Sequence, residues 1–150
     1  MPEKRTVERV RQAKREGKAP STQAGEFVRE EIEHIREGEH GARSTKQAIA
    51  IGLSKARRAG VKLPPPKKGA VSEQTRRKAQ REYEAAQLGE RRSPSPKRSR
   101  ATTRALRREG RQAASRASLS KEARSAARQR SRTERSRTSR KAARTRGANK

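Results

Sequence analysis

The chain has 150 residues, of which 43 are Lys or Arg and 16 are acidic, so its net charge at neutral pH is +27. Only 27% of the residues are hydrophobic, and the aromatic ones are Phe27 and Tyr83. A chain with so much charge and so little apolar surface cannot bury enough of itself to offset the cost of ordering its whole backbone. We therefore expect a mainly α-helical protein, with a small helical hairpin as its head and a long disordered, polycationic C-terminal tail.

Several classes of protein are disfavoured by what the sequence lacks. It has no cysteine, which excludes a disulfide framework and a cysteine-based zinc site. It also has no Asp, no Gly-rich phosphate loop and no nucleophile beside a base, so we expect no enzymatic activity, no cofactor and no small-molecule substrate. The longest apolar run, residues 48–53, is too short to cross a bilayer, and no hydrophobic signal segment is visible. We expect a cytoplasmic protein without a membrane partner.

Four helices are predicted in the first 90 residues. The first, roughly residues 3–16, has only a sparse apolar stripe. The second runs from about residue 22 to residue 37, where Gly38 ends it. The third begins behind Ser44 and Gln47, which have the spacing of a capping box, and ends at Gly60. A fourth, polar helix is predicted at residues 73–88.

The second and third helices form the predicted hairpin, because the link at residues 38–43 is short. Small residues at positions 48, 52, 56 and 59 of the third helix would let a partner helix approach closely. Glu31 falls within the apolar face of the second helix, where it either pairs with a basic residue of the third helix or reaches water as an edge carboxylate. The predicted core consists of Phe27, Val28, Ile32, Ile35, Ile49 and Leu53.

The predicted organisation has five parts. They are a weak N-terminal helix at 1–17, the hairpin at 18–60, an extended Pro/Lys linker at 61–71, the polar helix at 72–89 and the disordered Arg/Ser/Ala-rich tail at 90–150. Charge marks the last boundary, since residues 1–90 hold 21 basic and 13 acidic residues, whereas residues 91–150 hold 22 and 3. Within the tail, a stretch such as residues 120–128 would become helical only once a polyanion screens the repulsion between arginines.

The basic tail predicts binding to nucleic acid. Double-stranded DNA presents one charge per ~1.7 Å, and a cation-dense chain gains affinity by releasing condensed counterions. Arg, which supplies 18 of the 22 tail cations, forks two hydrogen bonds onto a phosphate. We expect sequence-independent binding by phosphate neutralisation, histone-like or nucleoid-associated, with DNA as the first partner. The predicted binding residues are Arg43, Lys46, Arg57, Arg58, Lys67, Lys68, Arg91, Arg92, Lys97, Arg98, Arg100, Arg104, Arg107, Arg108, Arg124, Arg128, Arg130 and Arg132.

Two alternative functions remain open. One is an RNA- or ribosome-associated basic protein with a Ser/Arg tail. The other is a helical protein-interaction module in which Phe27, Ile32 and Ile35 meet a partner, or a second copy of the chain through the hairpin.

Three local motifs have a functional and a plain interpretation. Residues 95–98, Ser-Pro-Lys-Arg, have the form of the turns of linker-histone tails, although a four-residue match in a biased segment is equally explained by coincidence. The N-terminus of the third helix would fit a helix-turn-helix, but a plain hairpin is favoured because the first predicted helix is weak. Glu31 and His34 have the Glu-x-x-His spacing of carboxylate metal sites. Such sites need a matching pair from other helices, so no metal is predicted.

Residues Gly17–Gly69 resemble a family of small, basic bacterial proteins that have no established activity. The resemblance is strongest at ARSTKQAIAIGLSKARRAG, and members share this helical head with an Arg/Ala/Ser-rich tail. Some members carry a loose DNA-binding label, and the resemblance implies a bacterial source. The tail is similar to linker-histone tails in composition.

Overall fold

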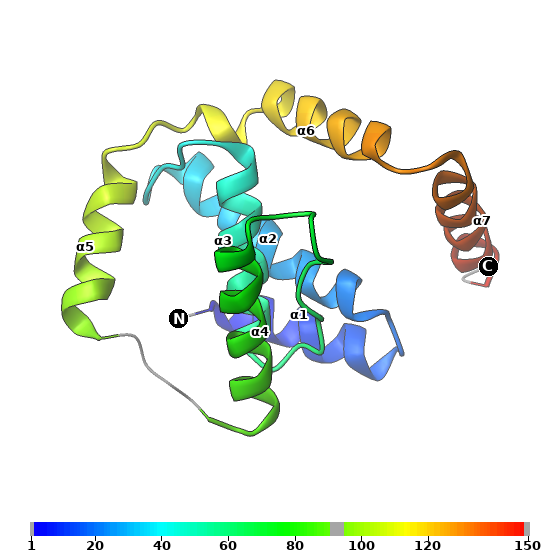
Figure 1. Ribbon diagram of the computed structural model, residues 1–150, viewed down its shortest axis with the longest axis horizontal. Helices are drawn as coiled ribbons and strands as arrows, with labels where there is room; N and C mark the ends of the chain where they lie inside the picture. Colours follow the sequence, from blue (N-terminus) through cyan, green and yellow to red (C-terminus); the bar gives the residue numbers. More distant parts are fainter. Residues whose placement is uncertain (1, 91–94, 149–150) are drawn as a thin grey trace. The chain divides into compact units, whose positions relative to one another are not determined.

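The computed structural model describes residues 2–90 and 95–148 (Figure 1). These residues form α1 (Lys4–Arg15), α2 (Pro20–Glu37), α3 (Thr45–Arg58), α4 (Glu73–Gln87), α5 (Pro96–Arg107), the 3₁₀ turn η1 (Gln112–Ala114), α6 (Arg116–Gln129) and α7 (Arg132–Ala148). The chain divides into two units, residues 1–115 and residues 116–150. We describe each unit by itself.

The predicted disordered tail is wrong, because its described residues are largely helical. Ala and Arg, which dominate the tail, are among the strongest helix formers. The tail helices are also capped: the Ser95 hydroxyl accepts from the Arg98 amide at 3.3 Å. Ser131 and Glu134 cap each other's backbone amides at the start of α7, at 3.2 and 3.1 Å. A lack of apolar surface therefore excludes a packed core here without excluding helices.

The four helices predicted in the first 90 residues are confirmed, with ends within two residues of those expected. The cap of α3 is also present, since the Ser44 hydroxyl accepts from the Gln47 amide at 3.2 Å. The reciprocal bond differs from the usual capping box. The Gln47 side chain accepts from the amide of Arg43, at 2.7 Å, and not from that of Ser44.

The core of the first unit lies where α2 packs on α3. Ala24, Phe27, Ala56 and Val61 form a buried cluster, against which Val10, Leu53 and Leu63 pack. Of the predicted core residues, Phe27, Ile32 and Ile35 are buried, whereas Val28, Ile49 and Leu53 are half-buried.

Gly52 sets the distance between these two helices. A Cβ atom at this position would lie 2.6 Å from the Val28 Cα atom, closer than real side chains come. The predicted close approach of α2 and α3 at small residues is therefore confirmed.

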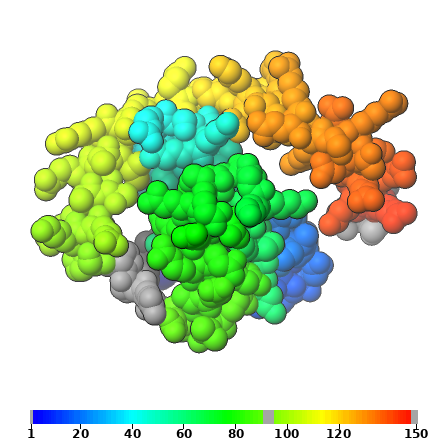
Figure 2. All heavy atoms as spheres, in the orientation of Figure 1, coloured from blue at the N-terminus to red at the C-terminus, as the bar shows by residue number. Residues whose placement is uncertain are grey.

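Residues 61–71, expected to be an extended linker, are attached to the core. Val61 is buried within it, and the Arg57 guanidinium donates to the carbonyl of Pro64 at 3.4 Å. α4 then packs on α3, where the Ser54 hydroxyl donates to the Glu82 carboxylate at 2.8 Å. In Figure 2, the atoms of α4 and of the preceding segment, in green, cover much of the visible face of the first unit.

α1, expected to be weak, is a packed helix. Thr6 and Ala13 are buried against the rest of the head. Arg9 and Glu26 form an ion pair across α1 and α2 at 2.9 Å, and the Glu3 amide donates to the Glu30 carboxylate at 3.1 Å.

A part of the expected tail, residues 106–114, docks on the loop between α2 and α3, and we call it the docked segment. The Gly41 amide donates to the carbonyl of Leu106 at 2.9 Å, and the Ala42 amide donates to that of Gly110 at 3.2 Å. A Cβ atom on Gly41 would lie 1.9 Å from the Glu109 carbonyl oxygen. Only glycine fits at this crossing of two backbones.

Side chains of the head complete the docking. The Thr45 hydroxyl donates to the carbonyl of Ala113 at 2.7 Å, and the Arg36 guanidinium donates to that of Ala114 at 3.0 Å. Both alanines are buried. Residues 106–114 therefore belong to the head, although their composition resembles the rest of the basic region. In the part of the chain that the structure describes, no helix is both long and apolar enough to cross a membrane.

Candidate nucleic-acid interface

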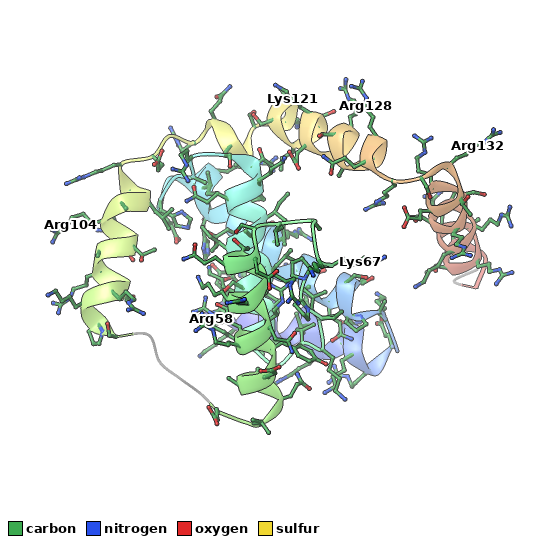
Figure 3. All side chains as sticks on the ribbon, in the orientation of Figure 1. Arg58, Lys67, Arg104, Lys121, Arg128 and Arg132 are labelled. Carbon is green, nitrogen blue, oxygen red and sulfur yellow. The ribbon has the colours of Figure 1, made fainter. Side chains whose placement is uncertain are left out.

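α5 carries four of its five cations on one face, and Arg98 lies outside it. At 100° per residue, Lys97, Arg100, Arg104 and Arg107 fall within an arc of about 80°, and Leu106 lies on the opposite side. The four cations are exposed, whereas Leu106 is half-buried towards the head. Figure 3 shows Arg104 extending from α5 into solvent. The helix thus turns its only large apolar side chain to the protein and its cations to water.

α6 and α7 carry similar stripes. On α6, Lys121, Arg124 and Arg128 have the spacing of one helix face and are all exposed. Lys121 and Arg128 extend away from the helix axis in Figure 3. On α7, Arg137, Arg140, Lys141 and Arg144 form such a stripe and are again exposed, while Arg132, Arg135 and Arg146 lie on the opposite side of the helix. Each stripe is a row of cations at the separation of one helical turn or less.

Carboxylates are too few in this part of the sequence to neutralise these cations. Residues 91–150 contain Glu109, Glu122 and Glu134 against 22 basic residues. The head is different, because several of its cations form ion pairs with carboxylates. On α4, for example, Arg76 binds Glu73 at 2.8 Å, which raises the pKa of the Arg76 guanidinium and lowers that of the Glu73 carboxyl.

The structure exposes most of the residues that the sequence predicts to bind nucleic acid. The exposed ones are Arg43, Lys46, Arg58, Lys67, Lys68, Lys97, Arg98, Arg100, Arg104, Arg107, Arg108, Arg124, Arg128, Arg130 and Arg132. Arg91 and Arg92 lie outside the described residues. Of the head residues among them, Arg58 and Lys67 lie apart from each other in Figure 3.

Arg57 is the exception, and its predicted place on the surface is wrong. The residue is buried, with 6% of its surface exposed. Burial lowers the pKa of its guanidinium, and its Nε atom has no hydrogen-bond partner among the described residues. The cause is the 61–71 segment, which folds back over this end of α3 and covers Arg57.

Sequence reasoning named several binding residues of α5 and α6 but left out most of α7. The omitted cations that the structure exposes are Arg116, Lys121, Arg135, Arg137, Arg140, Lys141, Arg144 and Arg146. Among them, Arg137, Arg140, Lys141 and Arg144 have the spacing of one helix face, a signal that the sequence contains. The expectation of a disordered tail leaves this signal unused.

Two local interpretations also change. Ser95 and Pro96, expected in a histone-type turn, are the cap and first residue of α5, so this motif begins a helix. The α3 N-terminus, considered for a helix-turn-helix, is covered at Thr45, which is buried and bonded to the docked segment. This contact occupies the end of the helix that a recognition helix presents to bases.

Comparison with known proteins gives one partial match. Residues 22–68 are similar to a protein family described as a family of unknown function (DUF6496). This region spans α2, α3 and most of the 61–71 segment, and includes neither α1 nor the basic helices. No curated protein matches the chain. No solved structure matches it.

Proposed function

We propose that this protein binds nucleic acid, with DNA as its main ligand, by neutralising phosphate charge without sequence preference. The observation that carries the proposal is the set of exposed cation stripes on α5, α6 and α7. The stripes lie on helices that form without a ligand, so phosphates would meet cations that are already arranged. In the cell, the protein would then be nucleoid-associated and cytoplasmic.

Duplex DNA is favoured over unpaired RNA because the chain offers no stacking platform. Proteins that bind unpaired bases stack them on exposed aromatic rings. The chain has two aromatic residues, of which Phe27 is buried and Tyr83 is half-buried. Arginine, in contrast, suits the phosphates and the narrow minor groove of duplex DNA.

The alternative function as a protein-interaction module is disfavoured, because the side chains expected to form its surface are not exposed. Phe27, Ile32 and Ile35, which were to meet a partner, are buried inside the head. Among the described residues, the exposed large apolar side chains are Val71 and Leu88, which belong to different segments. Neither builds the contiguous apolar patch that protein interfaces contain.

The test is the salt dependence of binding by the full chain to a random-sequence DNA duplex. If about 6–10 phosphates are contacted, the logarithm of the association constant falls against log salt with a slope of about −5 to −9. Affinity should drop about 10³- to 10⁵-fold between 50 and 200 mM salt. A flat salt response would overturn the proposal. Tighter binding to a single-stranded RNA of equal length would favour the RNA alternative.

A charge-matched pair of variants tests the stripes themselves. Replacing Arg137, Arg140 and Arg144 with Gln removes three cations from the α7 stripe, and should reduce the slope by up to about 2.7. The control replaces three exposed cations of α1 (Arg11, Lys14 and Arg15) with Gln. An equal reduction of the slope in both variants would mean that net charge alone governs binding and that the stripes have no special role.

A further inference from the structure

Glu31, His34 and His40 converge inside the head. Each of the three offers one ligand atom, and these atoms lie within 4.8 Å of one another. Glu31 and His34 are buried on α2, and the half-buried His40 is supplied by the loop that follows. In the sequence, Glu31 and His34 have metal-site spacing and His40 follows nearby among glutamates, but no second Glu-x-x-His motif indicates that the three meet. The fold brings them together by turning the chain at Gly38, whose φ of 84° favours glycine.

His40 is oriented as metal-binding histidines are. Its Nδ1 atom lies 3.0 Å from the carbonyl oxygen of Gly41, which can only accept a hydrogen bond. Nδ1 therefore carries a proton, and in the neutral ring Nε2 keeps a lone pair. This Nε2 atom lies 3.2 Å from Glu31 Oε1. Two acceptors facing each other at this distance require a cation between them, either a proton or a metal ion.

His34 is held in a similar way. Its Nε2 atom lies 3.0 Å from Glu3 Oε1, a carboxylate that orients the ring by accepting its proton. The second ring nitrogen, Nδ1, then keeps its lone pair and lies 3.7 Å from Glu39 Oε2. A carboxylate behind a histidine is a common support of zinc ligands. Glu39 is exposed and is therefore free to move towards a bound ion.

The charges around this cluster do not balance. Glu30 and Glu31 are both 1% exposed, and Lys55 is the one cation of α3 that reaches them. Its Nζ atom lies 2.7 Å from Glu31 Oε2 and 3.6 Å from Glu30 Oε1. Neither oxygen of Glu31 has a hydrogen bond of regular geometry within the described part of the chain. With neutral histidines, the buried charge is one negative in excess, and burial of uncompensated charge is costly.

We propose that Glu31, His34 and His40 bind a divalent transition-metal ion of the zinc class. Two imidazoles and one carboxylate are a ligand set that zinc accepts, with a fourth position for Glu39 or water. An open hollow lined by Glu39, His40, Thr103, Leu106 and Arg107 reaches the cluster and gives an ion a path to it. A bound ion would tie the end of α2 to the loop that holds the docked segment.

The first test uses the full chain without a histidine tag. Titration with Zn²⁺ should show one saturable site with a Kd below about 10 µM, and Co²⁺ should give the intense visible absorption of a four-coordinate ion. His40→Gln should weaken binding more than about tenfold, because it removes a ligand. The matched control is Glu33→Gln beside His34 on α2, because Glu33 is half-buried and pairs with Arg29, not with the cluster; this change should leave the Kd unchanged.

A second variant helps to decide whether a metal ion or a proton lies between His40 and Glu31. Lys55→Met removes the ammonium that lies 2.7 Å from Glu31, so Zn²⁺ should bind more than about tenfold tighter and raise the melting temperature more than in the parent. The cobalt spectrum needs no variant, so it remains informative if one of them fails to fold. Absence of saturable binding and of this spectrum in the parent chain would overturn the proposal and leave a proton between His40 and Glu31. So would equal Zn²⁺ affinities for the parent and His40→Gln.

Discussion

Gly41→Ala should release the docked segment from the head while leaving the α2–α3 hairpin folded. The new Cβ atom would lie 1.9 Å from the Glu109 carbonyl oxygen and 2.6 Å from that of Gly110. Neither the backbone at Gly41 nor that of the docked segment can move away without breaking the hydrogen bonds that join them. Gly41 does not have a positive φ, so the contact, and not the conformation of residue 41, excludes alanine.

The free energy of docking that Gly41→Ala removes can be estimated from the interactions that the new Cβ atom breaks. The segment must retreat by about 1 Å or more, which lengthens the 2.9 Å bond from Gly41 to Leu106 beyond hydrogen-bonding range. Five hydrogen bonds, among them the one from Arg111 to the carbonyl of Arg36, at about 1 kcal/mol each and two alanine methyls at about 0.8 kcal/mol each set an upper limit of about 6–7 kcal/mol. The conformational entropy that the released segment gains offsets part of this loss of free energy. We expect a loss of about 2–4 kcal/mol, a 30- to 700-fold rise in local opening.

Hydrogen exchange followed by mass spectrometry measures this opening directly. Peptides covering residues 38–44 and 106–115 should lose protection in Gly41→Ala, whereas those from the middle of α2 should keep it. Gly25→Ala is the matched control, because a Cβ there meets nothing within 4 Å. It should stabilise α2 by about 0.5–1 kcal/mol, as alanine does inside a helix. Unchanged protection at residues 38–44 in Gly41→Ala would refute the docking.

Three further substitutions test the head. Gly52→Ala should lower stability by about 1–3 kcal/mol in thermal unfolding, despite the higher helix propensity of alanine, because its Cβ meets the Val28 backbone. Ser44→Ala should cost about 1 kcal/mol by removing the cap of α3, and a melting temperature unchanged from the parent would contradict that cap. Arg57→Met should be neutral or stabilising and leave DNA affinity unchanged, whereas Arg58→Met, at the exposed neighbour, should weaken it. Equal DNA affinities for these two variants would contradict the different exposure of the two arginines.

The helices of the head could be predicted because each has its own local signals. Gly38 and Gly60 end α2 and α3, and Ser44 caps α3; such signals act over a few residues and are therefore visible in the sequence. The pairing of Glu31 with α3, one of two alternatives left open, is confirmed at Lys55. Contacts between distant segments were not predictable in this way. The docking of residues 106–114 depends on small residues and backbone groups, which have no distinctive pattern in a segment rich in Ala and Arg.

The helices of the tail do not follow from its overall composition. Composition decides whether a chain can bury a core, and α6 and α7 indeed have no buried residue among their described side chains. It does not decide whether the backbone forms helices, which depends on propensity and caps. For the same reason, most of the exposed cations of α7 were not among the predicted binding residues. The burial of Arg57 was not predictable from the sequence either, because it depends on residues 61–71 folding over the end of α3.

If the basic region binds a polyanion as proposed, its capped helices change how the affinity would arise. A disordered arginine-rich segment loses conformational entropy when it settles on its ligand, and this loss lowers the affinity obtained from each contact. α7 is a helix before any ligand arrives, held at its start by Ser131 and Glu134. Each arginine it offers therefore contributes to affinity with little entropy lost from the backbone. Binding should then show the small heat-capacity change of preorganised partners, in contrast to the large negative one that accompanies folding on a ligand.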